Sequence, residues 1–359
     1  MINVISDINP KKRFRQSFGN TQNSAQQPLN YVDKFLSELE KTNKKEQNGS
    51  FFTKYFWSTT ALSLSAIPVL GYELGAFFKI RKMKKDGLKI EVDALKKSFK
   101  SKFKYVLLGG IALFAGLEAL FNSFNEKNYK KLENNFKNIN TLTNAQLSGA
   151  FRSGYVGAYC TSSSGHIRVN RNIMNDPITN RSMTKLIKHE LVHARQFEMI
   201  ARSKDGIKKL NYANIMNVIN IAQKNPKTIE EFIQIHKDIQ NDKTGKYDNK
   251  EITILGEKYD FKKYIEAINI ILTNKNATYN DIPIIINENH YKKVIEEKGS
   301  LTPDEEKKAD EYYDALVNYQ LPKYPLDAYN PFSKYRNNIL EQEAYKENPS
   351  LLMKLFGKN

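Results

Sequence analysis

The chain has 359 residues, enough for one or two domains with a sizeable buried core. Its single cysteine, Cys160, excludes an internal disulfide framework. The formal net charge of +17 raises the question of a nucleic-acid partner, but no sequence signature of a nucleic-acid-binding fold accompanies it, so none is expected.

The N-terminal region, residues 1–50, is expected to be largely disordered. Residues 1–28 are rich in Asn, Gln and Ser, a composition typical of disordered segments. Within the remainder, residues 29–45 are compatible with a short amphipathic helix. The apolar positions that support this helix are Leu29, Val32, Leu36 and Leu39.

Two apolar runs follow. Residues 56–78 contain one charge in 23 positions, and residues 105–124 contain one in 20. As a helix, each run is long enough to cross a hydrocarbon core of about 30 Å. Residues 79–104 between them carry eleven basic and three acidic residues, a net charge of +8. This pattern predicts a transmembrane hairpin over 51–124, with a basic loop facing anionic lipid on the cytoplasmic side and the rest of the chain outside the cytoplasm.

The alternative for these runs is a buried helical hairpin that crosses no membrane. Glu73 and Glu118 favour this alternative, because carboxylates are costly in lipid. After the second run, residues 125–148 are polar and are predicted to form a connector that is helical in part.

A strand pair and a helix are predicted next. Residues 155–170, YVGAYCTSSSGHIRVN, are typical of two short strands around a Thr-Ser-Ser-Ser-Gly turn. Residues 181–200 contain no Gly or Pro, and their apolar residues recur at three- and four-residue steps, which predicts a helix. This helix contains the sequence HELVH, residues 189–193.

The spacing within HELVH suits a metal site. Histidines four positions apart on a helix project from the same side, and imidazole nitrogens are common zinc ligands. Zinc lowers the pKa of a bound water towards about 7, and a carboxylate beside the metal can take its proton. His189 and His193 are therefore candidate metal ligands, and Glu190 is the candidate catalytic base. The alternative is a helix whose histidines are satisfied within a core.

The region after this helix, residues 205–330, is predicted to be mostly helical. A small hairpin is expected over 250–261 around Gly256. The clearest helix begins at Thr302, where Glu305 completes a capping box.

The sequence HELVHARQ resembles the active-site helix of the zincin metallopeptidases, and HIRVN (166–170) resembles their edge strand. The resemblance covers about residues 150–200 and one point near the C-terminus. It implies an α+β, predominantly helical fold, with a zincin-like domain over 149–359 that contains a helical insert over 205–330. It also implies Zn²⁺ as the cofactor and a polypeptide substrate that pairs with the main chain of the edge strand. The implied substrate-binding residues are Ile167, Val169 and Asn170.

The third metal ligand distinguishes the zincin subclasses. Metzincins require Gly and His where this chain has Gln196 and Met199, so that subclass is excluded. Gluzincins take a Glu from a later helix, in a pattern Glu-x-x-Ala-Asp that EQEAY (341–345) resembles. This likeness implies Glu341 as the third ligand, with Glu343 as its rival.

Two features near the C-terminus leave the assignment open. Glu311, in KADEYYDA, is a further candidate ligand. Tyr345 stands where the family pattern has an Asp, a residue that usually orients a ligating histidine.

Together these features predict a membrane-anchored, gluzincin-like zinc metalloendopeptidase in which Glu190 activates water. Tyr335 and Tyr345 flank the third-ligand candidate, and either is a candidate for stabilising the oxyanion. The expected partners are a polypeptide substrate and membrane lipid. The alternative is a non-catalytic, membrane-anchored helical binding protein with a structural or vestigial metal site.

Overall fold

The computed structural model describes residues 31–48, 56–151, 156–171, 177–222, 226–320 and 333–347. Over these ranges the fold is α+β and predominantly helical, as predicted. The elements are α2 (Tyr31–Asn48), α4 (Phe56–Lys85), α5 (Lys89–Ile139), β1 (Leu147–Phe151), β2 (Ala158–Cys160), β3 (Ile167–Asn170), α6 (Pro177–Arg202), α7 (Gly206–Ala222), α8 (Pro226–Asn241), β4 (Glu251–Ile254), β5 (Glu257–Asp260), α9 (Phe261–Thr273), α10 (Glu288–Lys298), α11 (Pro303–Val317) and α12 (Ile339–Glu347).

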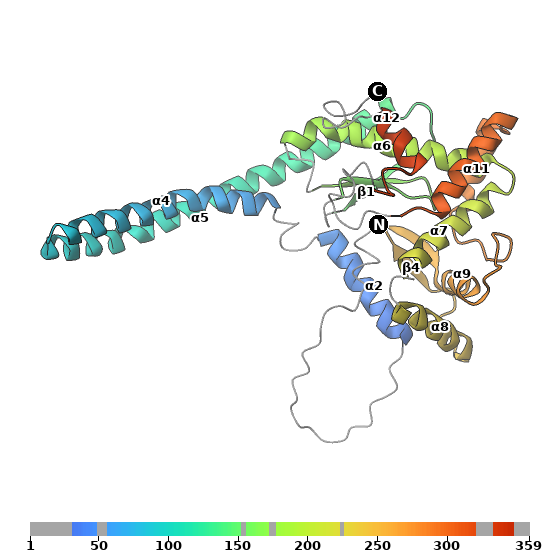
Figure 1. Ribbon diagram of the computed structural model, residues 1–359, viewed down its shortest axis with the longest axis horizontal. Coiled ribbons are helices and arrows are strands. Elements are labelled where there is room, and N and C mark those ends of the chain that lie inside the picture. Colours follow the sequence, from blue (N-terminus) through green and yellow to red (C-terminus); the bar gives the residue numbers. More distant parts are fainter. Residues whose placement is uncertain are drawn as a thin grey trace, which may run out of the picture.

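The body of the protein is built around α6 and a three-stranded sheet (Figure 1). The strand order is β1-β3-β2, with β3 parallel to β1 and antiparallel to β2. Helix α6 packs against β2 and β3. Its Ile187 and Leu191 lie one turn apart and are buried, and Ile167 and Val169 of β3 are buried in the same core. The apolar spacing that predicted this helix therefore marks the face that meets the sheet.

The prediction that residues 166–170 form an edge strand is wrong. Ile167, Val169 and Asn170 lie on β3, which is the central strand and is paired on both sides. All three residues are fully buried. Because the main chain of β3 is already engaged by β1 and β2, a substrate cannot add to it as a further strand. The strands at the two edges of the sheet are β1 and β2, and of these β2 contacts α6.

The region between α6 and α12 packs directly on α6 through α7, α10 and α11. Its predicted hairpin is confirmed: β4 and β5 are antiparallel, and Leu255 and Gly256 connect them with φ of 54° and 77°. Two positive φ angles are typical of the two-residue turn that suits a twisted hairpin. The predicted capping box of Thr302 and Glu305 at the start of α11 is also present.

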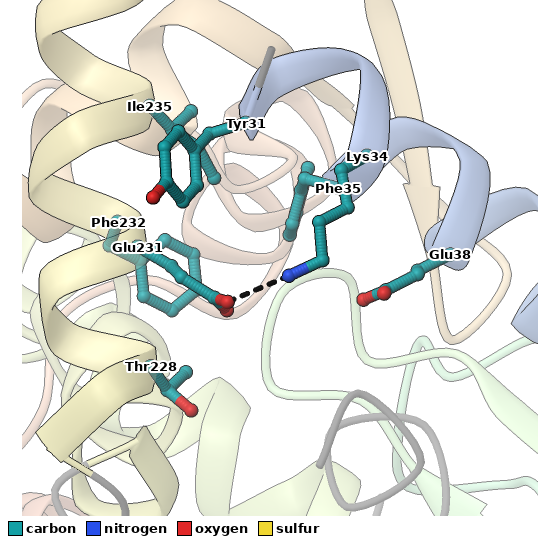
Figure 2. A pocket seen from close by; sticks show the side chains of 8 residues that line it. All are labelled: Tyr31, Lys34, Phe35, Glu38, Thr228, Glu231, Phe232 and Ile235. Carbon is teal, nitrogen blue, oxygen red and sulfur yellow. Dashed lines mark hydrogen bonds and ion pairs between the residues drawn. The ribbon is translucent and has the colours of Figure 1, made fainter. Parts of the chain in front are cut away.

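The amphipathic helix predicted over residues 29–45 is confirmed by α2, which spans residues 31–48, whereas residues 1–30, including the segment predicted to be disordered, lie outside the described residues. Phe35 of α2 is buried, with its ring centroid 6.0 Å from that of Phe232 and 6.1 Å from that of Phe261. At the rim of this contact, Lys34 pairs with Glu231 of α8 at 2.8 Å (Figure 2). Burial of this aromatic face thus stabilises the helix that the apolar spacing predicted.

A buried ion pair joins α2 to the sheet. Arg168 of β3 donates to Glu46 of α2 at 3.1 Å and to the Tyr159 hydroxyl of β2 at 2.8 Å. The side chains of Arg168 and Glu46 are only 11% and 6% exposed. Gly256 makes room for this contact, because a Cβ there would lie 2.4 Å from the Arg168 guanidinium.

A second polar contact ties the start of β3 to β5. His166 Nδ1 lies 3.1 Å from Glu257 Oε1, and both side chains are mostly buried. Burial raises the pKa of Glu257, but hydrogen bonds from His166, Ser164 and Thr161 outweigh it and hold that pKa below its usual range.

Helices α4 and α5 pair as a long hairpin that projects from the body (Figure 1). The expected basic loop is wrong, because only residues 86–88 separate the two helices. Most of the basic residues between the apolar runs therefore lie on helical turns: Lys79, Arg81, Lys82, Lys84 and Lys85 on α4, and Lys89, Lys96, Lys97, Lys100, Lys102 and Lys104 on α5.

The predicted membrane spans are also wrong. Among the residues that the structure describes, no helix has a stretch both long enough and apolar enough to cross a bilayer. Each apolar run is joined to charged residues of the same helix: Lys79 follows the run in α4, which itself contains Glu73, and Lys104 precedes the run in α5. The prediction of a two-span membrane protein is therefore withdrawn. The placement of the site outside the cytoplasm rested on that topology and loses its basis.

Replacing Arg168 with Met is expected to lower the free energy of unfolding by about 3–5 kcal/mol, because it leaves the Glu46 carboxylate buried without its cation. Urea unfolding at pH 7 measures the change. The matched control is Lys258→Ala, which removes an exposed pair with Glu251 and should cost less than about 1 kcal/mol. Equal costs for the two variants would contradict a structural role for the buried pair.

Acid is expected to weaken the contact between His166 and Glu257. A carboxyl group whose pKa is lowered in the folded state stabilises it above the ordinary pKa of 4.5, and this contribution is lost as pH falls through the folded pKa. The free energy of unfolding of the wild type should therefore fall more steeply below about pH 4.5 than that of Glu257→Gln. Urea titrations from pH 3 to pH 7, with Glu251→Gln as the control on the same hairpin, provide the measurement; parallel curves for wild type and Glu257→Gln would refute it.

Candidate metal centre

Helices α6 and α12 bring three predicted ligands together. His189 and His193 lie one turn apart on α6, and their Nε2 atoms are 3.2 Å apart. Glu341 of α12 places Oε2 at 3.3 Å from His189 Nε2 and Oε1 at 3.3 Å from His193 Nε2. All three side chains are buried, and within the described ranges they form a group whose arrangement could hold a metal ion.

The spacing of the three groups fits a shared cation better than direct contacts among them. Charge-assisted hydrogen bonds between nitrogen and carboxylate oxygen are usually about 2.7–2.9 Å long, and these separations exceed that range. Ligands of a tetrahedral metal with bonds of about 2.0–2.1 Å lie roughly 3.3–3.4 Å apart, close to the values found here. In addition, Glu341 Oε2 is buried and accepts no hydrogen bond from the described residues. The residues present therefore fit a metal ion.

The electrostatics of the group also require a cation. Burial lowers the pKa of His193, but attraction to Glu341 outweighs this effect and raises the pKa of His193 to about 9. Burial likewise raises the pKa of Glu341, but the two histidines outweigh it and hold that pKa far below its ordinary value. Glu341 is therefore an anion within the protein core. Its charge must be balanced by a proton on the imidazoles or by a metal ion.

Glu190 lies beside the group without belonging to it. It follows His189 on α6, and its buried carboxylate accepts a hydrogen bond from the main-chain N–H of Cys160 on β2. Burial raises the pKa of Glu190, and this effect outweighs the opposing influence of the nearby His189 and His193. The structure thus places the predicted catalytic base between the edge strand and the candidate ligands.

The rival third ligands are engaged elsewhere or are exposed. Glu343 accepts hydrogen bonds from the Tyr312 hydroxyl and from Gln196, and it pairs with Lys308 at 3.1 Å. Glu311 lies on α11 and is exposed to solvent. Of the three candidates, only Glu341 faces the two histidines.

Two side chains for which the sequence predicted no role hold the ligands in place. The Tyr319 hydroxyl donates to Glu341 Oε1 at 2.5 Å, and no sequence pattern indicated this contact. Gln196 Oε1 lies 2.9 Å from His193 Nδ1. The sequence had offered Gln196 only as evidence against the metzincin subclass, although its position three residues after His193 on a helix was a usable signal.

The two tyrosines proposed to stabilise an oxyanion occupy different surroundings. Tyr345, which replaces the expected Asp, packs edge-on against His189 with ring centroids 4.5 Å apart. The guanidinium of Arg336 lies 3.5 Å from the centre of the Tyr345 ring. Tyr335 packs against Tyr319, with ring centroids 5.9 Å apart. The first histidine is therefore held by aromatic packing where the family pattern has a carboxylate.

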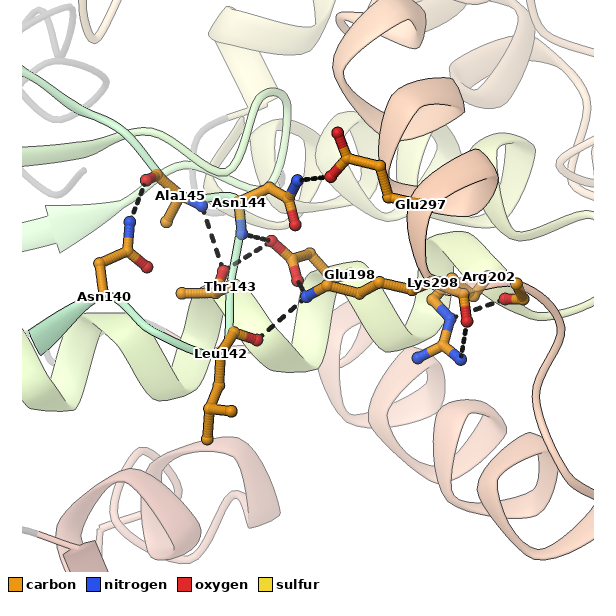
Figure 3. Close-up of polar contacts among 10 residues, drawn as sticks. Asn140, Leu142, Thr143, Asn144, Ala145, Glu198, Arg202, Glu297 and Lys298 are labelled. Carbon is orange, nitrogen blue, oxygen red and sulfur yellow. Dashed lines mark hydrogen bonds and ion pairs between the residues drawn. The ribbon is translucent and has the colours of Figure 1, made fainter. Parts of the chain in front are cut away.

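The far end of α6 is anchored by a buried carboxylate (Figure 3). Glu198, five residues after His193, is 3% exposed and accepts hydrogen bonds from the Thr143 hydroxyl and the Asn144 main-chain N–H, both at 2.6 Å. It also pairs with Lys298 at the end of α10. These contacts hold α6 against α10 and against the segment that leads from α5 into β1, so the helix is a rigid support for its two histidines.

No family model, curated protein or solved structure matches this chain.

Proposed function

We propose that this protein is a zinc-dependent hydrolase of peptide bonds, with His189, His193 and Glu341 as metal ligands and Glu190 as the catalytic base. One observation carries the proposal. The Nε2 atoms of two buried histidines lie 3.2 Å apart and each lies 3.3 Å from one of the two carboxylate oxygens of buried Glu341, while a second carboxylate, Glu190, stands beside these residues but outside the group. This is the division of roles that hydrolysis by an activated water requires.

The donor set favours zinc among common metals. Two imidazole nitrogens and one carboxylate oxygen suit Zn²⁺, whereas calcium and magnesium prefer oxygen ligands alone. Catalytic zinc sites use three protein ligands and keep a further position open, whereas structural sites are closed by four. No fourth His, Cys, Asp or Glu joins the group in the described part of the chain, which supports a catalytic site over a structural one.

The chemistry follows from the position of Glu190. A zinc ion held by these residues would supply Lewis acidity, which acidifies water and polarises a carbonyl group. The Glu190 carboxylate takes one proton from the water molecule while the oxygen of that water forms a bond to the carbonyl carbon. The same carboxyl group then gives this proton to the amide nitrogen as the carbon–nitrogen bond breaks. The products are a carboxylic acid and an amine, and Glu190 returns to its starting state.

The edge strand supports a polypeptide substrate, although at β2 instead of the predicted β3. The Thr161 N–H donates to His166, and the Gly157 carbonyl accepts from Asn170, so both groups face β3. By the alternation of a strand, the main-chain groups of Ala158 and Cys160 face the opposite way, and the Cys160 N–H meets Glu190. The residues of β2 are buried and the Cys160 N–H is engaged by Glu190, so a peptide would add to this side of β2 only by displacing that contact, and it would then lie beside the catalytic base.

Removing one ligand is expected to abolish metal binding. Wild type should bind one zinc ion per chain, and His193→Ala should bind none at stoichiometric zinc, because two remaining protein ligands hold the ion poorly. The control is His236→Ala, which removes a histidine of α8 outside the group. Elemental analysis after dialysis gives the metal content. Zinc retained by His193→Ala at the wild-type level would disprove the ligand assignment.

Glu190→Gln is expected to separate catalysis from metal binding. The variant should keep its zinc, because Glu190 is not in the ligand group, and should lose hydrolysis by about a hundred- to ten-thousand-fold. Turnover of a mixed peptide library, with and without a chelator, is the assay. If wild type binds zinc but cleaves no peptide, or if Glu190→Gln cleaves as fast as wild type, the hydrolase proposal fails and a structural metal site is the better account.

A further inference from the structure

We propose that Gln196 is a positioning residue. It selects the tautomer of His193 that can bind a metal, and it links His193 to α12, the helix that carries Glu341. This inference rests on the proposed function, because it concerns how the same donor set is assembled. Gln196 lies on α6, three residues after His193, and its side chain is 2% exposed. A polar side chain buried to this extent must use its hydrogen-bonding groups within the protein.

The first contact determines which nitrogen of His193 is free. Gln196 Oε1 lies 2.9 Å from His193 Nδ1. An amide oxygen has no proton to donate, so Nδ1 is the donor and carries the hydrogen. In the neutral imidazole, Nε2 is then left with a lone pair, and Nε2 is the atom that faces His189 and Glu341. Gln196 therefore selects the tautomer that can bind a metal and holds the ring in the matching orientation.

The other end of the amide reaches α12. Gln196 Nε2 lies 3.2 Å from the main-chain oxygen of Leu340 and 3.3 Å from Glu343 Oε2. Both of these atoms are acceptors, so the amide nitrogen must face them and the amide oxygen must face His193. The orientation of Gln196 is thus determined by the Leu340 oxygen and Glu343, because both contacts would be lost with the amide reversed.

These contacts link the two ligand-bearing helices at the point where the link matters. Leu340 directly precedes Glu341, so the amide that holds the second histidine also holds the backbone of the third ligand. Helix α12 has only nine residues, and helices of this length are marginal without tertiary contacts. By engaging Glu343 as well, Gln196 keeps that rival carboxylate away from the histidines. One side chain therefore positions two ligands and excludes a third.

The test measures zinc affinity by competition with a chromophoric chelator, which does not depend on turnover. Gln196→Leu removes all three hydrogen bonds and should weaken zinc binding about 10- to 100-fold. Glu343→Gln is the matched control, because it changes a partner of Gln196 but leaves the contact with His193 intact, so its affinity should stay within about threefold of wild type.

A double variant separates positioning from packing. Gln196→Glu alone places a carboxylate beside Glu343 and should weaken zinc binding through repulsion. Gln196→Glu combined with Glu343→Gln exchanges the roles of the two side chains. The carboxylate at position 196 can accept from His193 Nδ1, and the amide at position 343 can donate to it, so the link to α12 is then carried by position 343 because the hydrogen bond to the Leu340 oxygen is lost. The double variant should therefore recover zinc affinity to within about fivefold of wild type, an outcome that Gln196→Leu cannot reach.

The outcomes distinguish this inference from the proposed function. If wild type binds no zinc, the proposed function fails and this inference fails with it. If wild type binds zinc and hydrolyses peptides but Gln196→Leu binds zinc as tightly, the positioning role is wrong and the hydrolase proposal stands. If Gln196→Leu is weakened but the double variant recovers nothing, the hydrogen bond to His193 is not the cause, and the inference is overturned. Melting temperatures of the metal-free variants check that each one folds.

Discussion

The structure depends on the burial of one carboxylate. Glu341 is 1% exposed, and an isolated carboxylate in such surroundings is strongly unfavourable. It is tolerated because Tyr319 donates to one oxygen and two imidazoles face the group. Those partners come from α6 and from the residues that follow α11. Glu341 therefore meets them only when α12 packs correctly against α6 and against the end of α11. A cation among these groups is the element that makes this arrangement electrostatically consistent.

Helix α6 carries this arrangement because tertiary contacts hold it along its length. Its apolar face meets the sheet through Ile187 and Leu191, its polar face presents the histidines, and its far end is held by Glu198. Helices α7, α10 and α11 pack around it. The segment that Glu198 binds leads directly from α5, so the hairpin of α4 and α5 joins the body at the same place that holds the end of α6 (Figure 1, Figure 3).

The strand order decides where a substrate can lie. A strand can be extended by a peptide only at an unpaired edge, and β3 is paired on both sides although its sequence looked most like an edge strand. The side of β2 that faces away from β3 meets Glu190 through Cys160.

The sequence alone determined features that depend on neighbours along the chain. The helix around HELVH, the hairpin at Gly256 and the capping box at Thr302 were all predicted, because periodicity, turn geometry and capping act over a few residues. Only the tertiary structure decided features that depend on distant partners. Glu341 lies 148 residues after His193, and its advantage over Glu343 comes from Tyr312, Lys308 and Gln196, which engage the rival. The same holds for the place of β3 within the sheet and for the partners of the predicted helix α2, whose Phe35 packs against Phe232 and Phe261. The apolar runs show the limit of sequence-based prediction most clearly. Each run has the length of a membrane span, but only the structure shows that α4 and α5 extend beyond these runs into charged segments and that no described helix is suited to cross a bilayer.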